Sequence, residues 1–320
     1  MRVLVTGGSG FIGSHVVDRL RADGHEPRNF DLRPSQHGAV DTVVGDLLDP
    51  DAVGRALDGC DAVVHLAAVA DVNDVVADPA RAEAVNTHGT SVLLDAVRRK
   101  RTPRVLYGST VWVYGDGASG QLLDEDAPLP PPKHLYTATK LAGELLCETY
   151  GVEHTILRFG IPYGPRARAS TVVAAFVGRA LAGSPLTIAG DGRQSRRFVY
   201  VEDLADGVVA ALTPVAAGRT YNLVGTEDVT VSEIADTVRE LVRDVPVGHG
   251  KGRAGDLQGA AISGERAARE LGWRPQTPFR AGVARYVGWL TEQQRTPRAA
   301  TASTIDGRAA AVLRHAPGEL

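Results

Sequence analysis

Residues 6–13 read TGGSGFIG and stand between a short β-branched run, Arg2–Thr6 (RVLVT), and a helical pattern over residues 11–23. In that pattern apolar residues recur every three or four positions, which predicts an amphipathic helix. Glycines between a strand and a helix let the backbone approach a pyrophosphate, which the helix N-terminus stabilises. The stretch therefore predicts a dinucleotide-binding loop, in which the cofactor contacts Gly7, Gly10, Phe11, Ile12 and Gly13.

The second predicted strand ends in an acid, which supports this interpretation. Asp31 lies 18 residues after Gly13, close to the spacing of about 20 at which such sites place an acid on the ribose hydroxyls. Its charge would repel a 2′-phosphate and so favours NAD over NADP, although Arg33 weakens that preference. Asp46 and Leu47, after the third predicted strand, could hold the adenine, but Asp46 could equally cap a helix.

Short apolar runs alternate with helical patterns along the first half of the chain. This alternation predicts βαβ units, and hence an α/β fold with a Rossmann-type, doubly wound parallel sheet. Strands are expected near residues 2–6, 27–31, 41–45, 61–66, 104–107 and 154–158, and helices over residues 11–23, 50–57, 79–99 and 134–150.

The pattern becomes mixed beyond residue 170, which predicts a smaller α/β substrate lobe interleaved with the first. Residues 115–132 and the stretch GIPYGPRAR, residues 160–168, are expected to be loops and turns. We assign residues 1–165, with returning segments at about 197–224, to the NAD-binding domain, and residues 166–196 and 225–293 to the substrate lobe. Residues 294–320 form a tail with weak periodicity, expected to pack loosely.

Composition excludes several classes of protein. The formal net charge of −3 over 320 residues gives no basic footprint for nucleic acid. Two cysteines, Cys60 and Cys147, are too few for a disulfide framework or a Cys-rich zinc site, and no metal site is predicted. A signal peptide and an apolar run of about 18 residues are both missing, so we expect a cytoplasmic protein that does not enter the membrane.

Tyr136 and Lys140 stand four residues apart at the start of a predicted helix, so they share one face. A phenol has an ordinary pKa of about 10, too high for a general base at neutral pH. A nearby ammonium and the positive nicotinamide of an oxidised cofactor would both stabilise the phenolate and lower that pKa. The pair predicts an acid–base site, although surface pairs at this spacing are common.

The stretch STVWVYG, residues 109–115, places two hydroxyls at the end of a predicted strand. Ser109 and Thr110 could be satisfied hydroxyls of a buried strand end, or part of a catalytic segment. Their position between the glycine loop and the Tyr136–Lys140 pair favours the catalytic interpretation.

These motifs together resemble the extended short-chain dehydrogenase/reductase family, in its NAD-dependent nucleotide-sugar epimerase and dehydratase branch. The resemblance runs from residue 1 to about 290. It rests on TGGSGFIGSH, HLAA (65–68), VNTHGT (85–90), STVWVYGD, YTATKLAGE, GDGRQSRRFVYVEDL, YNLVG, RAGD (253–256) and LGWRP.

The resemblance implies roles for particular side chains. Thr110 would hydrogen-bond the 4-hydroxyl of a sugar, Tyr136 would remove its proton, and Lys140 would lower the pKa of the tyrosine. Carbon 4 of the sugar would give its hydride to NAD and so become a ketone. The NAD site would also include Leu66, Ala67, Ala68, Ser109, Tyr136 and Lys140.

Two apolar residues narrow the reaction. Family dehydratases carry Asp-Glu directly after the catalytic threonine, and related decarboxylases carry a Glu at the second of these positions. Here the two positions are Val111 and Trp112, whose side chains cannot transfer a proton in elimination. Epimerisation or a one-way keto reduction at a single carbon remains.

The predicted substrate site matches the family in part. Arg196 and Arg253 stand where family arginines bind the nucleotide diphosphate, as a guanidinium does well. Ile161 replaces the family asparagine that holds this diphosphate, and cannot donate a hydrogen bond. Family epimerases pair through two helices of each subunit, which here would be residues 79–99 and 136–150.

The sequence thus predicts an NAD-dependent nucleotide-sugar 4-epimerase that acts through a 4-keto intermediate. Its substrate would be a nucleotide-diphosphate sugar, a UDP-hexose or a UDP-hexuronate, and the protein would be a homodimer. Two alternatives are a nucleotide-sugar 4-ketoreductase and a non-catalytic NAD-sensing protein.

Overall fold

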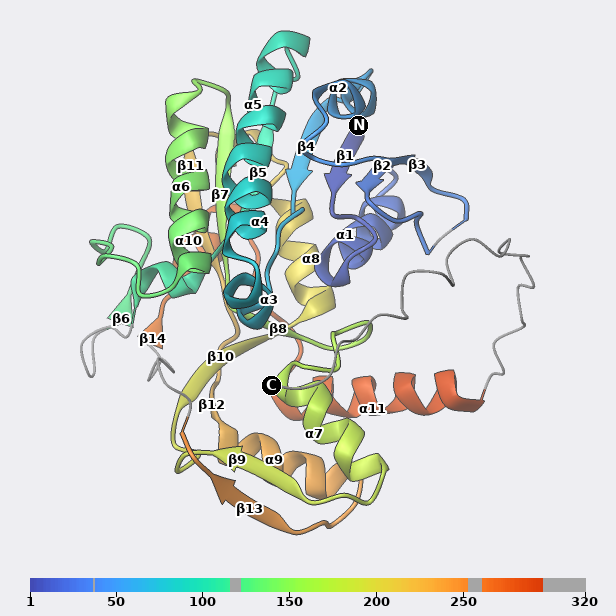
Figure 1. Cartoon of the computed structure of the whole chain (residues 1–320), viewed down its shortest axis with the longest axis vertical. Helices are drawn as coiled ribbons and strands as arrows, with labels where there is room; N and C mark the ends of the chain where they lie inside the picture. Colours follow the sequence, from blue (N-terminus) through green and yellow to red (C-terminus); the bar gives the residue numbers. More distant parts are fainter. Residues whose placement is uncertain (37, 116–121, 253–260, 296–320) are drawn as a thin grey trace, which may run out of the picture.

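The computed structural model describes residues 1–36, 38–115, 122–252 and 261–295. Its centre is a seven-stranded sheet in the order β11-β7-β5-β4-β1-β2-β3, in which neighbouring strands are parallel (Figure 1). The strands are β1 (Arg2–Thr6), β2 (Glu26–Asp31), β3 (Asp41–Val44), β4 (Ala62–His65), β5 (Val105–Thr110), β7 (His154–Phe159) and β11 (Arg219–Leu223). This sheet confirms the predicted fold class.

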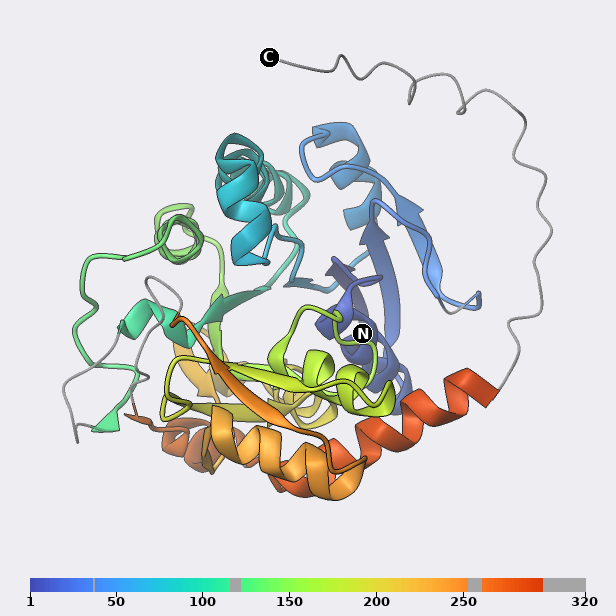
Figure 2. The same cartoon turned by 60° about the horizontal axis from the view of Figure 1, so that its bottom comes forward.

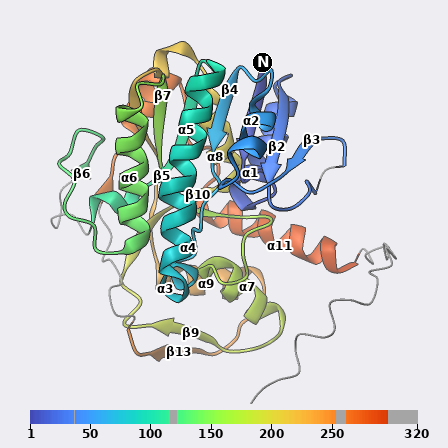
Figure 3. The same ribbon diagram turned by 45° about the horizontal axis from the view of Figure 1, so that its top comes forward.

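Helices cover both faces of the sheet and bury its apolar residues. On one face α1 (Phe11–Ala22) packs against α8 (Val201–Ala210). The other face carries α2 (Pro50–Leu57), α5 (Gly89–Lys100) and α6 (Leu135–Thr149), of which α5 and α6 run side by side (Figure 3). The chain winds outward in opposite directions from β1 and β4, so a crevice opens at the carboxyl ends of these strands.

The segment between β4 and β5 differs from the single helix predicted over residues 79–99. It comprises α3 (Val72–Ala77), α4 (Pro79–Glu83), the π-helical turn η1 (Ala84–His88) and α5. Asp71 and Asp78 accept backbone hydrogen bonds at the starts of α3 and α4, so each short helix has its own N-cap. Sequence periodicity predicted neither α3 nor the π-helical turn.

A second lobe lies below the sheet in Figure 1, and Figure 2 shows it from its own side. Its core includes an aromatic cluster in which the ring centroid of Phe279 lies 5.0 Å from Tyr163 and 5.4 Å from Phe198. The elements are β8 (Ile161–Tyr163), α7 (Val172–Leu181), β9 (Leu186–Ala189), β10 (Ser195–Tyr200), β12 (Asp228–Thr230), α9 (Val231–Leu241), β13 (Val247–Gly250) and α11 (Phe279–Arg295).

Two of these strands correct the sequence prediction. Residues 161–163 were expected to be part of a turn, but they form β8, which pairs in parallel with β10. β10 itself lies in a stretch for which no strand was predicted, and its other edge pairs with β12. Pro162 and the surrounding glycines give β8 a turn-like composition, and only pairing across the lobe reveals it.

The assignment of residues to two domains stays a prediction, and one segment of it behaves differently. α10 (Glu265–Leu271) was placed in the substrate lobe, yet Ala267 and the following Trp273 pack in the core under α8 and β11. Trp273 Nε1 donates to the Asp203 carbonyl oxygen on α8 at 2.9 Å. The predicted tail lies outside the described residues from position 296 onward.

Two short strands, β6 (Leu122–Leu123) and β14 (Ala261–Ile262), pair beside the main sheet, and β6 lies in the predicted loop 115–132.

None of the helices in the described residues has the length and apolar character needed to span a bilayer.

Candidate active site

A cavity of about 1390 Å³ opens at the carboxyl ends of β1, β4 and β5 and continues into the second lobe. The predicted NAD-binding and catalytic residues all line it, as does Arg196. Those residues are Gly7, Gly10, Phe11, Ile12, Gly13, Asp31, Arg33, Asp46, Leu47, Leu66, Ala67, Ala68, Ser109, Thr110, Tyr136 and Lys140. Arg253, the remaining predicted residue, lies outside the described part of the chain.

The glycine loop has the shape that a dinucleotide pyrophosphate requires. Gly7 adopts φ = +71°, which glycine tolerates, and its N–H donates to the Phe30 carbonyl oxygen at 2.8 Å. Gly10 is the N-cap residue of α1 and brings no side chain of its own. The first turn of α1 therefore presents its backbone N–H groups and its positive dipole end toward the cavity, so the residues present fit a bound pyrophosphate.

Asp31 ends β2 at the rim of this loop. Its carboxylate accepts hydrogen bonds from the backbone N–H groups of Ser9 and Arg33, both at 3.1 Å. The Arg33 guanidinium reaches back to the Ser9 carbonyl oxygen at 3.3 Å and lies 3.8 Å from Asp31. The acid is thus fixed beside the loop, where a ribose would meet it.

The structure excludes one of the two roles predicted for Asp46, that of a helix cap. Its carboxylate accepts only a local hydrogen bond in the described structure, from the Leu48 N–H at 3.0 Å. The N-cap of α2 is instead Asp49, which accepts from the N–H groups of Asp51 and Ala52. Capping therefore does not account for Asp46, and its place in the cavity wall leaves the adenine role as a prediction.

A buried chain of hydrogen bonds connects the glycine loop to the catalytic helix. The Thr6 hydroxyl accepts from the N–H groups of Leu66 and Ala67, both at 3.1 Å, so it donates its own proton to His65 Nδ1 at 2.7 Å. The other ring nitrogen, Nε2–H, then donates to the Thr90 hydroxyl at 3.0 Å. Burial lowers the pKa of His65 to about 3, so the ring stays neutral in this tautomer.

The chain continues through the π-helical turn. The Thr90 hydroxyl donates to the Asn86 carbonyl oxygen at 2.6 Å. The Asn86 amide exchanges two hydrogen bonds with the Val69 backbone and donates a third to the Thr139 hydroxyl on α6, at 3.1 Å. Loop, cavity wall and catalytic helix are therefore positioned by one polar network.

Replacing His65 with alanine is expected to lower the free energy of unfolding by about 2–4 kcal/mol, because it opens a cavity and leaves two buried hydroxyls without their partner. Urea unfolding followed by circular dichroism would measure the loss. His88→Ala, an exposed histidine on η1, should change stability by less than about 1 kcal/mol. Equal losses in the two variants would show that the network contributes nothing.

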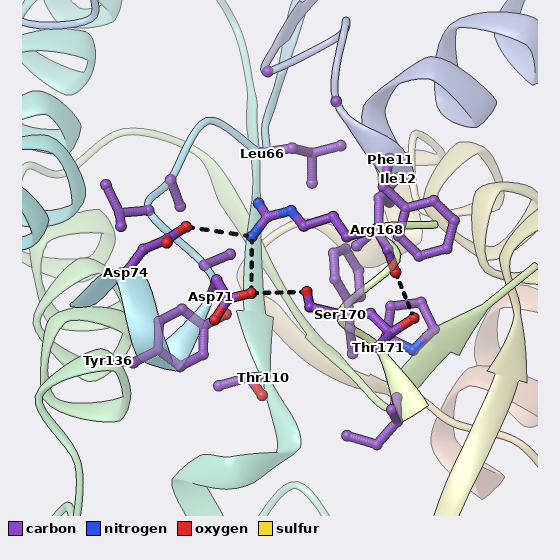
Figure 4. A pocket seen from close by; sticks show the side chains of 18 of the residues that line it. Phe11, Ile12, Leu66, Asp71, Asp74, Thr110, Tyr136, Arg168, Ser170 and Thr171 are labelled. Atoms are coloured by element: carbon purple, nitrogen blue, oxygen red, sulfur yellow. Dashed lines mark hydrogen bonds and ion pairs between the residues drawn. The ribbon is translucent and has the colours of Figure 1, made fainter. Parts of the chain in front are cut away.

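Thr110 and Tyr136 face the same part of the cavity, from β5 and α6 (Figure 4). The Thr110 hydroxyl accepts from the Trp112 N–H at 3.2 Å, which leaves its proton free to be donated. Lys140 lies one turn after Tyr136, is 5% exposed, and its Nζ sits 4.7 Å from the centroid of the Tyr107 ring. Burial lowers the pKa of Lys140 to about 8.

The protein without its cofactor does not lower the pKa of Tyr136. Lys140 was predicted to lower its pKa, but burial raises the pKa of Tyr136 to about 12, and the opposing charge comes from Arg168. The phenolate loses its water on burial, and this outweighs the nearby cation. The charges of the protein alone therefore do not produce a base at neutral pH.

Trp112 forms the wall beside Tyr136, in the position where family dehydratases carry an acid. Its ring meets the Tyr136 ring edge-on, with centroids 6.0 Å apart. The indole Nε1 is buried and has no hydrogen-bond partner among the described residues. Ile161 on β8, which replaces the family asparagine, also lines the cavity.

Sequence reasoning missed a polar cluster that crosses the cavity. Arg168, from the loop after β8, lies 3.8 Å from Asp71 and 4.0 Å from Asp74, both in the segment after β4 (Figure 4). The Ser170 hydroxyl donates to the same Asp71 carboxylate at 3.1 Å. No local spacing signals this cluster, because its members come from segments about a hundred residues apart.

Ser109 was predicted to contact the cofactor, and its hydroxyl has a protein partner. It donates to the Glu144 carboxylate on α6 at 2.5 Å. Ser109 still lines the cavity, so its predicted role stays a prediction.

A Rossmann sheet whose glycine loop, strand-end hydroxyl and Tyr–Lys helix converge on one cavity defines an extended short-chain dehydrogenase/reductase. Residues 3–224 match the NAD dependent epimerase/dehydratase family, and the chain belongs to this family. NAD is accordingly its cofactor, as predicted.

Characterised relatives cover almost the whole chain. This chain is 34% identical over 316 residues to a UDP-glucose 4-epimerase of Mycolicibacterium smegmatis. The match covers 92% of this chain and 100% of the relative. It is 30% identical to a dTDP-glucose 4,6-dehydratase of Shigella flexneri, over 90% of this chain and 92% of the relative. The structure of MoeE5 in complex with UDP-glucuronic acid and NAD superposes with a TM-score of 0.85 at 31% identity, covering 92% of this chain and all of MoeE5.

Proposed function

We propose that this protein is an NAD-dependent nucleotide-sugar 4-epimerase that works through a 4-keto intermediate. Thr110 donates a hydrogen bond to the sugar 4-hydroxyl, and Tyr136 takes its proton as a phenolate. The Lys140 ammonium and the positive nicotinamide of the oxidised cofactor would together stabilise that phenolate against burial. NAD, when bound along the glycine loop, supplies a reversible hydride acceptor. The keto sugar must present its other face before it takes the hydride back, and Trp112 lines the cavity beside Tyr136 where this would occur.

The observation that carries this proposal is the pair of residues after Thr110. Relatives of this chain include both epimerases and 4,6-dehydratases. A dehydratase must also move a proton to eliminate water, and Val111 and Trp112 have no group that can do so. With Thr110 and Tyr136 facing one cavity, chemistry at a single carbon is what remains (Figure 4).

A panel of nucleotide sugars followed by NMR tests the proposal. Conversion of a UDP-hexose or a UDP-hexuronate to its 4-epimer, without added reductant, is the expected result. Stoichiometric consumption of NADH with a 4-keto sugar would identify the ketoreductase instead. Binding of NAD with no turnover of any sugar would favour the NAD-sensing protein.

Arg168 favours a hexuronate over a neutral hexose. Its guanidinium lies across the cavity from Thr110 and Tyr136 (Figure 4), and a sugar carboxylate there would pair with it in place of Asp71 or Asp74. The similar protein MoeE5 has been crystallised both with UDP-glucose and with UDP-glucuronic acid, so a site of this kind can hold either sugar. We therefore propose UDP-hexuronate as the preferred substrate.

Replacing Arg168 with glutamine is expected to raise KM for the UDP-hexuronate at least tenfold, because a charge-assisted hydrogen bond is lost. KM for the UDP-hexose should change less than about threefold, since that sugar has no carboxylate. Any effect on Tyr136 acts on both substrates and cancels in the ratio. Equal changes in the two KM values would remove Arg168 from substrate selection.

We also propose a homodimer formed through α5 and α6. These helices are neighbours on one face of the sheet, and Leu145 on α6 is 61% exposed there (Figure 3). Family epimerases pair through the two helices at this position, and an exposed leucine suits such a contact. Light scattering is expected to give twice the chain mass of 33.8 kDa, and the monomer mass would contradict the proposal.

A further inference from the structure

Glu144 continues the row of buried functional side chains on α6. Tyr136, Lys140 and Glu144 are spaced by four residues, so they lie one above the other on a single helix face. Glu144 is 4% exposed, in a position where a charged residue is rarely found without a partner. The sequence predicted no role for Glu144.

The Glu144 carboxylate is held by partners from the sheet. The Ser109 hydroxyl donates to Oε1 at 2.5 Å, and Arg158 on β7 donates from Nε to Oε1 at 3.1 Å and from Nη2 to Oε2 at 2.7 Å. The two side chains of this ion pair are only 5% and 6% exposed. Arg158 in turn donates to the Tyr114 hydroxyl at 2.8 Å. The Glu144 carboxylate is therefore fixed in place by Ser109 and Arg158.

Glu144 is the charged group near Lys140 that stabilises its ammonium form. Burial lowers the pKa of Lys140, and the charges that oppose burial come from Glu144 and, more weakly, Cys147. The facing groups from the sheet are the rings of Tyr107 on β5 and His65 on β4, both neutral at physiological pH.

The other charged groups around α6 have partners of their own. Asp71 and Asp74 at α3 face Arg168, and Asp95 on α5 pairs with Arg98 and Arg99. Arg81 and Glu83 on α4 and His88 on η1 are exposed. Trp112, in the 3₁₀-helical turn η2 (Val111–Tyr114), carries no charge.

We propose that Glu144 is a positioning residue that keeps Lys140 charged beside Tyr136, with Arg158 and Ser109 holding its carboxylate in place. This rests on the proposed role of Lys140 in the 4-epimerase. Tyr136 must be a buried phenolate before it can take the sugar proton and become neutral, and that anion needs a charged ammonium one turn away. Without Glu144, burial would favour the neutral amine, and that stabilisation would be lost.

The chain has only four lysines, which makes the charge of Lys140 directly measurable. The other three, Lys100, Lys133 and Lys251, are exposed and serve as internal references. In protein labelled with ¹³Cε-lysine, the NMR signal of Lys140, assigned with Lys140→Met, should titrate near pH 8, where burial places its pKa. No sugar is needed for this measurement.

Glu144→Gln is expected to lower the Lys140 midpoint by about one pH unit, since it removes the negative charge that lies one helical turn away on the same face. At a fixed pH, the ratio of charged to neutral Lys140 would then fall about tenfold. Glu148→Gln, the same change one turn later at an exposed position, should leave the midpoint within about 0.2 units. Equal midpoints in wild type and folded Glu144→Gln would overturn the inference.

A double variant covers the possibility that Glu144→Gln does not fold, since it leaves the Arg158 guanidinium buried and unpaired. Glu144→Gln with Arg158→Gln removes both charges, so stability should recover while the Lys140 midpoint stays low. A wild-type midpoint in the folded double variant would show that Glu144 acts only on Arg158. If the wild type turns over no sugar but Glu144→Gln still lowers the Lys140 midpoint, the role of Glu144 stands. In that case the proposed epimerase activity is refuted instead.

Discussion

Tyr136→Phe is expected to abolish sugar turnover while NAD stays bound. The substitution removes one oxygen, and with it the group that takes the proton from the sugar 4-hydroxyl. General acid–base catalysis contributes about 10²–10⁴-fold, so kcat should fall by about a thousandfold. Turnover is measured by NMR with the sugar that the wild type converts, and bound NAD by its absorbance after release from the protein.

The rest of the site should tolerate this change. The Trp112 ring contacts the Tyr136 ring edge-on, and phenylalanine keeps that contact. Tyr150→Phe, at the far end of α6 and outside the cavity lining, is the matched control and should keep kcat within about twofold. Wild-type turnover in Tyr136→Phe would exclude Tyr136 as the base.

Gly13→Ala is expected to abolish NAD binding and to lower the free energy of unfolding by about 2–3 kcal/mol. The added Cβ would lie 2.2 Å from the Gly7 carbonyl oxygen and 2.8 Å from Gly8 Cα, both backbone atoms of the loop itself. The loop or α1 must therefore move, and overpacking of this kind costs about 1–3 kcal/mol or more. Calorimetric titration with NAD and urea unfolding would measure the two effects.

Gly54→Ala provides the matched control, because it makes the same change in α2. A Cβ at Gly54 would meet nothing within 4 Å, so the higher helix propensity of alanine should stabilise the protein by up to about 1 kcal/mol. Unchanged NAD affinity in Gly13→Ala would mean that the loop does not hold the cofactor in the predicted manner.

The features that sequence predicted well are local ones. The strand, glycine turn and helix of residues 2–22 are contiguous, and Tyr136 and Lys140 are one helical turn apart, so spacing alone placed them. Asp31 needed only the end of the second strand. Each of these depends on a short stretch of chain whose conformation follows from its own residues.

The features that sequence did not predict depend on distant partners. Arg168 meets Asp71 across the cavity, and β8 becomes a strand only through its pairing with β10. The rise in the pKa of Tyr136 has the same origin, since burial by the whole fold outweighs the charge of Arg168, which comes from another segment. Glu144 could have been found at its four-residue spacing, but its partner Arg158 comes from another strand.

The π-helical turn η1 can be understood as one extra residue in an otherwise α-helical run from α4 to α5. Each residue turns an α-helix by about 100°, so deleting one residue there would swing one flank by that angle relative to the other. Asn86 would then no longer face both Val69 and Thr139. The register of this segment, and not only its composition, couples the cofactor loop to the helix of the base.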